Sequence, residues 1–460
     1  MTTTTTSAGR PRATPAHTVA DLVSRLGPLP GGDGPNDWLT LARQTALAWA
    51  TTSGFPTLKH EDWKYTPLGP MLETPFEHPW RETGAGGRIS PSEVNALSVE
   101  VASIRLVFVN GLFAPELSLF AELPVGVTVT NLASVLTEGG AGLERFFSRP
   151  FGEYDHAFTA LNTALAEDGA FIQVAADTLV SAPIELVFLS DPRGLPIIAH
   201  PRSLIVAGPG SSVTVVETYA GISGGATCTN AVTQVVLDEG AQVEHYKIQD
   251  EPESAFHLAL LDVCQGPDSR FSSGSVALGS KIARNEVRVR LEGEGAEVHI
   301  DGLYLPRSNQ HHDNPILIEH TAPRCTSRQL YKGIVDERGH GVFNGRIIVW
   351  PNAPGTDASQ TNKNLLLSDH AEVDTRPRLE IFTDDVKCTH GAAVGALDEE
   401  ALFYLRSRGM SREEAKALLT YAFASEMLDR VPFESLQARV RNLISARLST
   451  DDRIMEGMLR

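Results

Sequence analysis

Apolar residues recur with helical spacing near the start of the chain. Four of them stand at positions i, i+3, i+4 and i+7, namely Val19, Leu22, Val23 and Leu26. This pattern predicts a short amphipathic helix that ends at Gly27. A second helix is expected from about residue 37 to near residue 54, and its predicted buried residues are Trp38, Leu41 and Trp49. Residues 56–91 are rich in Pro and Gly and predict an irregular connection.

The pattern changes at about residue 101. Short β-branched runs such as IRLVFVNG, APIELVFLS and NEVRVRLEGEG follow one another up to about residue 393, separated by Gly, Asp, Asn and Pro. Helical periodicity vanishes in this stretch. It is therefore predicted to be a long all-β region.

A weak internal repeat runs through this β region. Pairs of small residues precede alternating strands at Gly169-Ala170, Gly210-Ser211, Gly240-Ala241 and Gly295-Ala296, with a variant at Ala371-Glu372-Val373. Their uneven spacing of 41, 30 and 55 residues argues against a propeller and suits a solenoid whose turns carry loops of different lengths. The pattern alone also permits a β-sandwich.

Helical signals return after residue 397. Asp398 is a candidate N-cap for DEEALFYLRSRG, and Ser411 with Glu414 forms a capping box for the next helix. The apolar positions of a last helix are Leu436, Val440, Leu443, Ile444 and Leu448. The predicted division is a disordered tail at 1–17, a helical region and connection at 18–100, a β core at 101–395 and a helical domain at 396–460.

Composition narrows the classes of function. The chain has 460 residues and a net charge of −18, which argues against nucleic-acid binding because phosphates attract a basic surface. No apolar run approaches the ~18 to 20 residues of a membrane-spanning helix, and no secretory signal is expected. The acid-free, Thr-rich first 20 residues fit a disordered tail or an organelle transit peptide. Four widely spaced cysteines suit a reducing cytoplasm.

The common catalytic motifs are missing from the sequence. It contains no GxxxxGK[ST] and no Gly-Lys pair, so the chain is not expected to bind or hydrolyse a nucleotide by P-loop chemistry. It also lacks the HExxH and GxGxxG motifs of zinc proteases and dinucleotide-binding enzymes. A free-standing enzyme is therefore not predicted.

The motif CTH at residues 388–390 offers candidate metal ligands. Cys388 and His390 would project from the same face of a strand, about 6.5 Å apart. A thiolate and an imidazole both bind iron, zinc or copper, but two ligands need others from a partner chain. A buried inert cysteine beside a hydrogen-bonded histidine is the alternative. Seven of the 14 histidines lie between His299 and His390, and they predict either a metal-collecting surface or hydrogen bonds at strand ends.

Two further segments predict structural roles. HEDWKYTPL at residues 60–68 places two aromatic residues among charges, and we expect it to anchor the N-terminal helices on the β region. Asn362 and Asn364 are expected to pair their amides inside a solenoid, while the leucines at 365–367 fill it.

These segments resemble one known family. HEDWKYTPL is similar to the N-terminal signature of SufD proteins, and SRQLYKGIVDERGHGVFNGRIIVW, QTNKNLLLSDHAEVDTRPRLEIFTDDVKCTHGA and LDEEALFYLRSRG resemble the C-terminal half of that family. The match covers residues 55–68 and about 300–430. The related SufB proteins usually carry CEHEA where this chain has CTHGA, and they lack the DWKY motif, so SufD is favoured.

The resemblance implies a fold and a set of partners. The expected fold is mainly β, a right-handed parallel β-helix with helical parts at both ends. The expected role is a scaffold subunit of an iron–sulfur cluster assembly complex, paired with a SufB-like subunit and bound to SufC-type ATPases through helices at 397–448. A homodimer of the isolated chain is an alternative that the sequence leaves open. Cys388 and His390 correspond to the family's CTH residues and would bind iron or a nascent cluster transiently, while persulfide acceptance falls to the partner.

Two rival functions remain open from the sequence. The first is a SufB-like subunit that itself carries the nascent cluster. The second is a β-helical polysaccharide lyase or hydrolase, which would need a cluster of carboxylates or basic residues in a groove.

Overall fold

The computed structural model describes residues 17–31, 37–79, 89–99, 102, 104–140, 142–222, 225–431 and 433–448. The predicted tail at 1–17 therefore lies outside the described residues, apart from its last position. The N-terminal elements are α1 (Val19–Leu26), α2 (Asp37–Ser53), the 3-10 turn η1 (Glu61–Trp63), α3 (Gly69–Leu72) and α4 (Pro91–Ala96). The first helix ends at Gly27, as predicted, because Gly27 adopts a φ of 86°.

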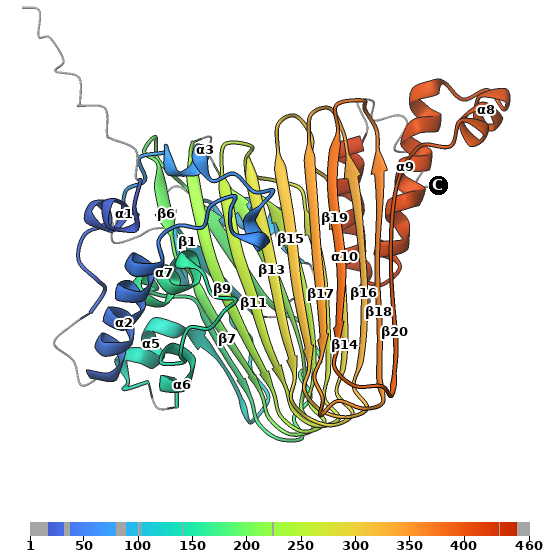
Figure 1. The fold of residues 1–460 in the computed structure, drawn as a ribbon. Coiled ribbons are helices and arrows are strands. Elements are labelled where there is room, and N and C mark those ends of the chain that lie inside the picture. Colours follow the sequence, from blue (N-terminus) through green and yellow to red (C-terminus); the bar gives the residue numbers. More distant parts are fainter. Residues whose placement is uncertain are drawn as a thin grey trace, which may run out of the picture.

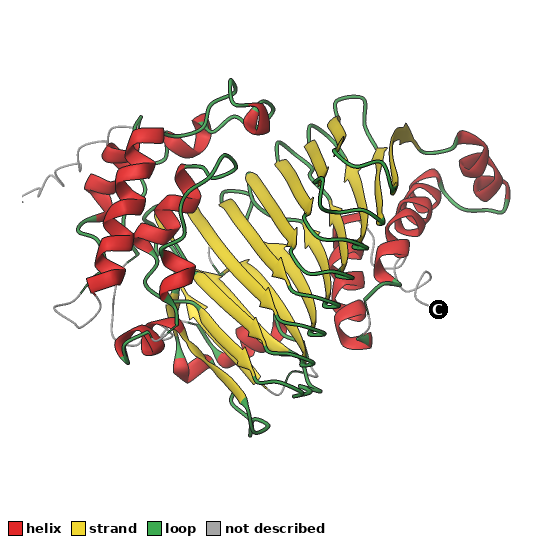
Figure 2. Ribbon diagram, turned by 60° about the horizontal axis from the view of Figure 1, so that its bottom comes forward, coloured by secondary structure: helices red, strands yellow, loops and turns green. Residues whose placement is uncertain are grey.

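Most of the chain forms two ten-stranded sheets that face each other (Figure 1, Figure 2). Sheet I contains, in spatial order, β2 (Leu112–Phe113), β1 (Ile104–Val109), β5 (Ile184–Ser190), β8 (Ser212–Gly221), β10 (Gln242–Asp250), β12 (Arg270–Ala277), β14 (Glu297–Tyr304), β16 (Thr326–Val335), β18 (Thr356–Leu366) and β20 (Val386–Ala396). Sheet II contains β3 (Val127–Asn131), β4 (Ala170–Val174), β7 (Arg202–Ala207), β9 (Thr227–Leu237), β11 (Phe256–Gln265), β13 (Ile282–Leu291), β15 (His311–His320), β17 (His340–Val349) and β19 (Glu372–Ile381), with β6 (Ile197–Ala199) beside β9.

The chain alternates between the two sheets and so winds into a parallel β-helix. Apart from β2 and β3, which pair antiparallel with β1 and β4, the strands pair in parallel with strands of the neighbouring turns. Gln242, for example, pairs with Ser212 on the preceding turn and with Arg270 on the following turn. The predicted β-helix is confirmed, and the sandwich alternative is wrong because the strands of successive turns pair in parallel, whereas the sheets of a sandwich are antiparallel.

The corners before β8, β10, β12, β14 and β16 of sheet I each contain a residue with a left-handed backbone. Gly210, Gly240 and Gly295 supply it, with φ between 64° and 74°. At the intervening and following corners, Asp268 and Arg324 adopt φ values of 51° and 56° in place of glycine. The apparent spacing of 55 residues between Gly240 and Gly295 therefore comprises two ordinary turns. The expectation of loops with very different lengths was wrong, because glycine does not mark every corner.

The space between the sheets holds a continuous apolar core. It is lined by alternate residues of each strand. Rings stack along the coil: Phe188 lies 5.0 Å from Phe108 and 4.8 Å from Tyr219, measured between ring centroids. Stacking one turn on the next places similar side chains over one another, and each added turn buries the face of the previous one.

The predicted amide ladder lies inside the last turns of the coil. Asn364 Nδ2 donates to Asn362 Oδ1 at 2.6 Å, and Asn362 Nδ2 donates to the carbonyl of Tyr331 at 3.2 Å. Tyr304 donates its hydroxyl proton to Asn364. The expectation for the leucines was wrong in part, because Leu367 packs with the C-terminal helices outside the coil.

Helices cover the outer face of sheet II near the N-terminal end of the coil (Figure 1, Figure 2). They are α1, α2, α5 (Leu132–Thr137), α6 (Glu144–Phe147) and α7 (Ala157–Leu165). The last three interrupt the region that was predicted to be all-β. All nine residues of α7 are buried, its polar residues Thr159, Asn162 and Thr163 included, so this helix has no exposed face.

The buried side of α2 also differs from the prediction. Leu41 is 65% exposed, whereas Leu39, Ala42 and Ala46 are buried. Trp38 and Trp49 are half-buried. The helix therefore packs through its small residues, which let it approach α7 closely.

The C-terminal helices are α8 (Glu399–Ser407), α9 (Arg412–Leu428) and α10 (Glu434–Leu448). The predicted caps are confirmed: Asp398 accepts from two backbone N–H groups, and Ser411 and Glu414 form a capping box. α9 and α10 pack on the outer face of sheet I, whereas α8 projects beyond the last turn (Figure 1). The helical region is thus continuous with the coil through an apolar interface.

Candidate functional site

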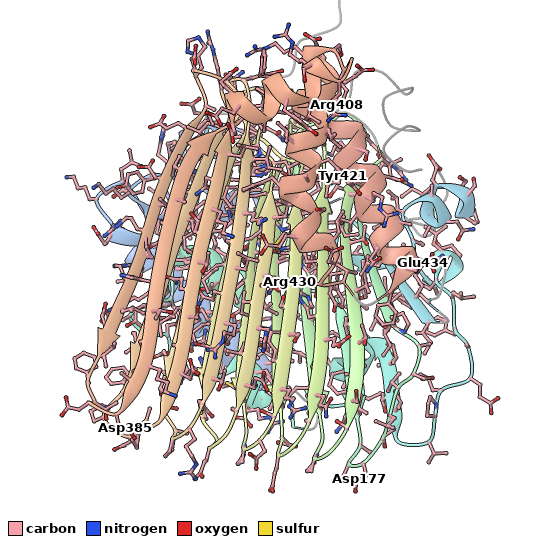
Figure 3. The ribbon with its side chains drawn as sticks, turned by 90° about the vertical axis from the view of Figure 1, so that its right-hand side faces the viewer. Asp177, Asp385, Arg408, Tyr421, Arg430 and Glu434 are labelled. Carbon is pink, nitrogen blue, oxygen red and sulfur yellow. The ribbon has the colours of Figure 1, made fainter. Side chains whose placement is uncertain are left out.

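Both sheets end at the same end of the coil in strands that lack a second neighbour. Within the part of the chain that the structure describes, β20 pairs with β18 alone, and β19 pairs with β17 alone. Figure 3 views the molecule from this side, with Asp385 at the turn that leads into β20. An edge strand of 11 residues presents a row of unpaired N–H and C=O groups, which is a template for pairing with another chain.

Cys388 and His390 lie on this edge strand. The register pairs Cys388 with Ala358 and His390 with Gln360, both of which are buried inside the coil. The two candidate ligands therefore share the inward face of β20, as the strand period predicts. Cys388 is half-buried against the core, and His390 is exposed because no further turn covers it.

The chemistry of Cys388 is that of a protonated thiol in this chain alone. Burial raises the pKa of its thiol, and the nearby Asp357 carboxylate adds to the rise. The thiolate is the metal-binding form. A positively charged metal or a basic group from a second chain would thus be needed to favour it. The other three cysteines are also free, and burial raises the pKa of each.

Cys388 and His390 have no third ligand close by in this chain. Among the described residues, neither belongs to a group of three His, Cys, Asp or Glu side chains whose ligand atoms lie within 4.8 Å of one another. The pair can therefore provide two donors of a metal site and no more.

Most of the crowded histidines have hydrogen-bonding roles. His312 Nε2 lies 2.9 Å from the carbonyl of Gly279, and His320 Nε2 lies 2.9 Å from Ser327 Oγ. Burial lowers the pKa of His312 and His320 to about 3 and about 4, so both rings are neutral at pH 7. These two buried rings make hydrogen bonds at strand ends, as the hydrogen-bonding hypothesis for the histidines predicts.

The HEDWKYTPL segment does anchor the N-terminal region on sheet II. Trp63 is buried, and its ring centroid lies 3.8 Å from the Arg284 guanidinium carbon. Arg284 also donates to the carbonyl of Asp62 at 2.9 Å. Further along the segment, Thr66 donates its hydroxyl proton to Asp313 at 2.6 Å. These contacts connect segments that lie far apart in the sequence.

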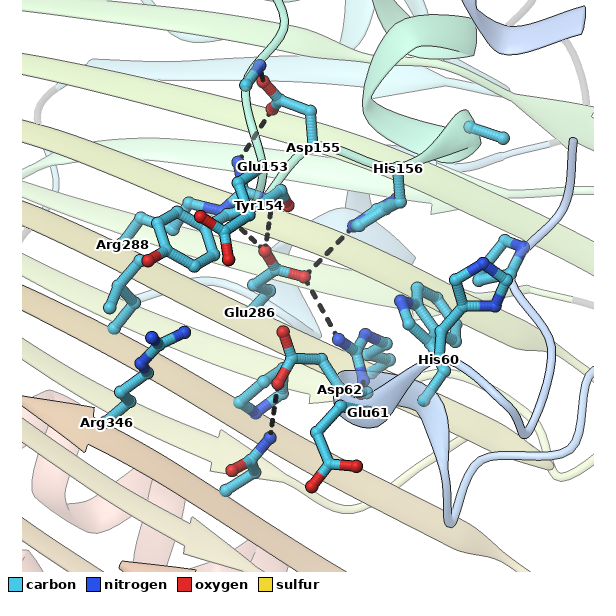
Figure 4. A pocket seen from close by; sticks show the side chains of 18 of the residues that line it. His60, Glu61, Asp62, Glu153, Tyr154, Asp155, His156, Glu286, Arg288 and Arg346 are labelled. Carbon is cyan, nitrogen blue, oxygen red and sulfur yellow. Dashed lines mark hydrogen bonds and ion pairs between the residues drawn. The ribbon is translucent and has the colours of Figure 1, made fainter. Parts of the chain in front are cut away.

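A cavity of about 330 Å³ lies beside this anchor, between η1, α2, the segment before α7 and the outer face of sheet II (Figure 4). Its arginines are engaged in ion pairs: Arg288 lies 2.8 Å from Asp155, and Arg346 holds both oxygens of Glu380. Burial alone would raise the pKa of Glu286, but Arg288 and His156 outweigh it and hold that pKa well below its usual value. The charged side chains that line the cavity are paired with one another. We therefore interpret the cavity as a structural contact between the N-terminal segment and sheet II.

The projecting helix α8 carries exposed aromatic residues. Phe403 is 73% exposed and Tyr404 is 57% exposed. Two neighbouring aromatic rings in water are typical of a surface that contacts another protein. Within the part of the chain that the structure describes, no helix is long and apolar enough to cross a membrane.

Sequence reasoning missed one group of potential ligands. His340, Glu372 and Asp374 hold ligand atoms within 4.8 Å of one another, although His340 and its cross-strand neighbour Glu372 belong to successive turns of the coil. These residues meet because of the strand register. That register could not be read from the sequence, because glycine does not mark every corner of the coil. The histidine count was the one signal that pointed to this region.

The sequence matches two family descriptions that together span most of the chain. Residues 33–186 match the SufBD protein N-terminal region, and residues 188–423 match the SufBD core domain of the SUF system of FeS cluster assembly. An iron–sulfur cluster assembly SufBD family protein of Synechocystis is 34% identical over 88% of this chain and 90% of its own length. The iron–sulfur cluster assembly protein SufD of Escherichia coli is 35% identical over 88% and 92%, and that of Bacillus subtilis is 28% identical over 72% and 77%.

Proposed function

The chain belongs to the SufBD family of iron–sulfur cluster assembly proteins, and we propose that it works there as the SufD-type scaffold subunit. The observation that carries this proposal is the end of the coil, where β19 and β20 each lack a second neighbour among the described residues and CTH lies on β20. We infer that a SufB-like subunit pairs with this end and closes it. In the absence of that subunit, a second copy of the chain would occupy the same edge as a homodimer.

Closure by a partner would complete a ligand set. The thiol of Cys388 and the imidazole of His390 face the space that the partner would cover. Iron and nascent iron–sulfur clusters accept both sulfur and nitrogen donors, and they need shielding from water. In this proposal the chain supplies these two donors transiently, and the partner supplies the remaining ligands and accepts the persulfide.

The C-terminal helices are proposed to bind the ATPase. Helices within residues 397–448 would contact SufC-type subunits, and the exposed rings of Phe403 and Tyr404 support α8 as the first contact. The chain has no P-loop sequence, so it binds no nucleotide in this proposal and is not itself catalytic. Four free cysteines support a reducing, cytoplasmic location.

The role of His390 is tested by His390→Ala in cells that depend on this assembly pathway. We expect the variant to keep its fold and its SufB-like partner but to fail in cluster delivery. Thr389→Ala is the matched control, since Thr389 is equally exposed but faces the opposite side of β20. Normal growth with His390→Ala would refute the ligand role.

The ATPase contact is tested without removing α9 and α10, which cover an apolar face of sheet I. We expect Phe403→Ala with Tyr404→Ala to abolish co-purification of the ATPase. Phe120→Ala is the control, because Phe120 is 52% exposed at the N-terminal part of the coil. Retained ATPase binding by the double variant would overturn the docking role of α8.

The distinction from a SufB-like subunit needs the isolated chain. Iron and sulfide are added under reducing conditions, and absorbance follows any cluster. The proposed SufD role predicts no stable cluster on this chain alone. A stable cluster would instead support the SufB-like alternative.

A further inference from the structure

Three potential metal ligands form a row on the outer face of sheet II. His311, His340 and Glu372 are direct cross-strand neighbours on β15, β17 and β19. Asp374 follows Glu372 at the next position on the same face. His340 and Asp374 have side chains that are 22% and 25% exposed, and Glu372 is exposed, so the row is reachable from water.

The hydrogen bonds around His311 define its tautomer. Thr66 has one hydroxyl proton and donates it to Asp313 at 2.6 Å. The 3.0 Å contact between Thr66 Oγ1 and His311 Nε2 therefore requires the ring nitrogen to donate. A neutral His311 then presents a lone pair at Nδ1. That nitrogen lies 3.2 Å from Nδ1 of His340.

A neutral His340 cannot satisfy both of its neighbours. Its Nε2 lies 2.8 Å from Asp374 Oδ2, where the ring nitrogen must donate because the carboxylate only accepts. Its Nδ1 then carries a lone pair that faces the lone pair of His311. With both rings neutral, two nitrogen lone pairs face each other across 3.2 Å, and a cation between the two Nδ1 atoms would relieve their repulsion.

A metal ion of borderline softness fits this gap. Imidazole nitrogens bind Zn²⁺ at about 2.0–2.1 Å, so two of them at a near-tetrahedral angle lie roughly 3.3 Å apart. The 3.2 Å separation of the two Nδ1 atoms is close to this value. The contact between His340 and Asp374 is the carboxylate–histidine pair that orients metal-bound rings.

We propose that a first-row divalent cation such as Zn²⁺ or Fe²⁺ binds between His311 and His340, with Glu372 as an oxygen ligand. Glu372 is exposed and is the cross-strand neighbour of His340, and ligand atoms of His340, Glu372 and Asp374 lie within 4.8 Å of one another. In this proposal the Glu372 side chain turns from that group toward His340 Nδ1 to bind the metal. Asp374 holds the proton on His340 Nε2. Water completes the coordination.

This site is separate from Cys388 and His390. Those residues lie on the inward face of β20 in sheet I, whereas the row lies on the outward face of sheet II. The bound metal would connect the last three strands of sheet II and, through His311 and Thr66, the N-terminal anchor. The inference does not depend on the proposed scaffold function.

The test uses full-length protein that carries Cys388→Ser and His390→Ala, so that the CTH pair contributes no binding. Calorimetric titration with Zn²⁺ is expected to show one tight equivalent, and Co²⁺ is expected to give the intense visible absorption of a site with four or five ligands. Zn²⁺ should also raise the melting temperature, because it binds the native state.

Single substitutions in this background locate the site. His340→Ala and His311→Ala should each abolish the tight equivalent, and Asp374→Asn should weaken Zn²⁺ binding about 10–100-fold, as for other carboxylates that orient a metal-bound histidine. Glu372→Gln, at an exposed position that the fold does not need, should weaken it at least about tenfold. The control His370→Ala removes an exposed histidine from a nearby turn and should change nothing.

Two results would overturn the proposal. One is the absence of a stoichiometric Zn²⁺ or Co²⁺ site in the background protein. The other is unchanged Zn²⁺ affinity in both His340→Ala and Glu372→Gln.

Discussion

Truncation of Trp63 provides a quantitative test of how the N-terminal segment is held. The ring is 4% exposed and contacts three partners: Arg284 at 3.8 Å, His156 at 5.1 Å and Phe158 at 5.8 Å. An aromatic side chain of this kind buries about 200 Å², and at about 25 cal/mol per Å² that burial contributes about 5 kcal/mol. A desolvated cation–π contact adds about 1–2 kcal/mol.

We therefore expect Trp63→Ala to destabilise the isolated chain by about 3–5 kcal/mol, the usual cost of an aromatic-to-alanine change in a core. Trp350→Ala is the matched control. Trp350 is 39% exposed and stacks on one ring, that of Phe382, at 5.8 Å, so its loss should cost about 1 kcal/mol.

The assay is guanidinium unfolding followed by tryptophan fluorescence and circular dichroism, with limited proteolysis to detect release of residues 55–72. Trp63→Ala should lower the unfolding midpoint well below that of Trp350→Ala and expose the segment to protease. Equal midpoints for the two variants, with the segment still protected, would refute the assignment of Trp63 as the anchor.

Further predictions concern the interior of the coil. Burial lowers the pKa of Lys247 to about 8, so the folded chain binds this proton less tightly than the unfolded chain does. Its contribution to stability should therefore increase from pH 8 to pH 10, and Lys247→Met should remove that increase in denaturation curves measured across this range. Gly302→Ala would drive a methyl group into the ring of Tyr331 and should cost about 1–3 kcal/mol, whereas Gly391→Ala, with open space around it, should leave the melting temperature unchanged.

The sequence carried enough information for the architecture but not for the register. β-branched runs between turn residues identify strands, and capping residues such as Asp398 and Ser411 mark helix starts, because both signals are local. The corners were different. Asp268 and Arg324 adopt a left-handed backbone at corners where other turns have glycine. A search for glycine misses these corners, and two successive turns are then read as one.

The periodicity of apolar residues also failed to predict helices, or their buried sides, where other elements pack around the helix. The helix at Ala157–Leu165 buries its polar residues together with its apolar ones, and α2 buries alanines in preference to Leu41. Both outcomes depend on how closely two helices approach, which is a property of the packed structure. The pairing of His340 with His311 and Glu372 depends on the register in the same way.

The candidate ligands Cys388 and His390 were found through a motif, and the structure explains why they share a face. Their position on an unpaired edge follows from where the coil ends in each sheet, which no local pattern in the sequence encodes.

Hydrogen exchange at this edge tests the proposed pairing with a second subunit most directly.

The measurement compares amide exchange in the monomeric chain, its mass verified, with exchange in the complex co-expressed with a SufB-like subunit. Residues 386–396 have one side of their backbone unpaired in the chain alone. Pairing by the partner predicts that exchange across this strand slows at least about tenfold, while the central strand at 297–304 is unchanged. Unaltered exchange at 386–396 in a verified complex would contradict the account.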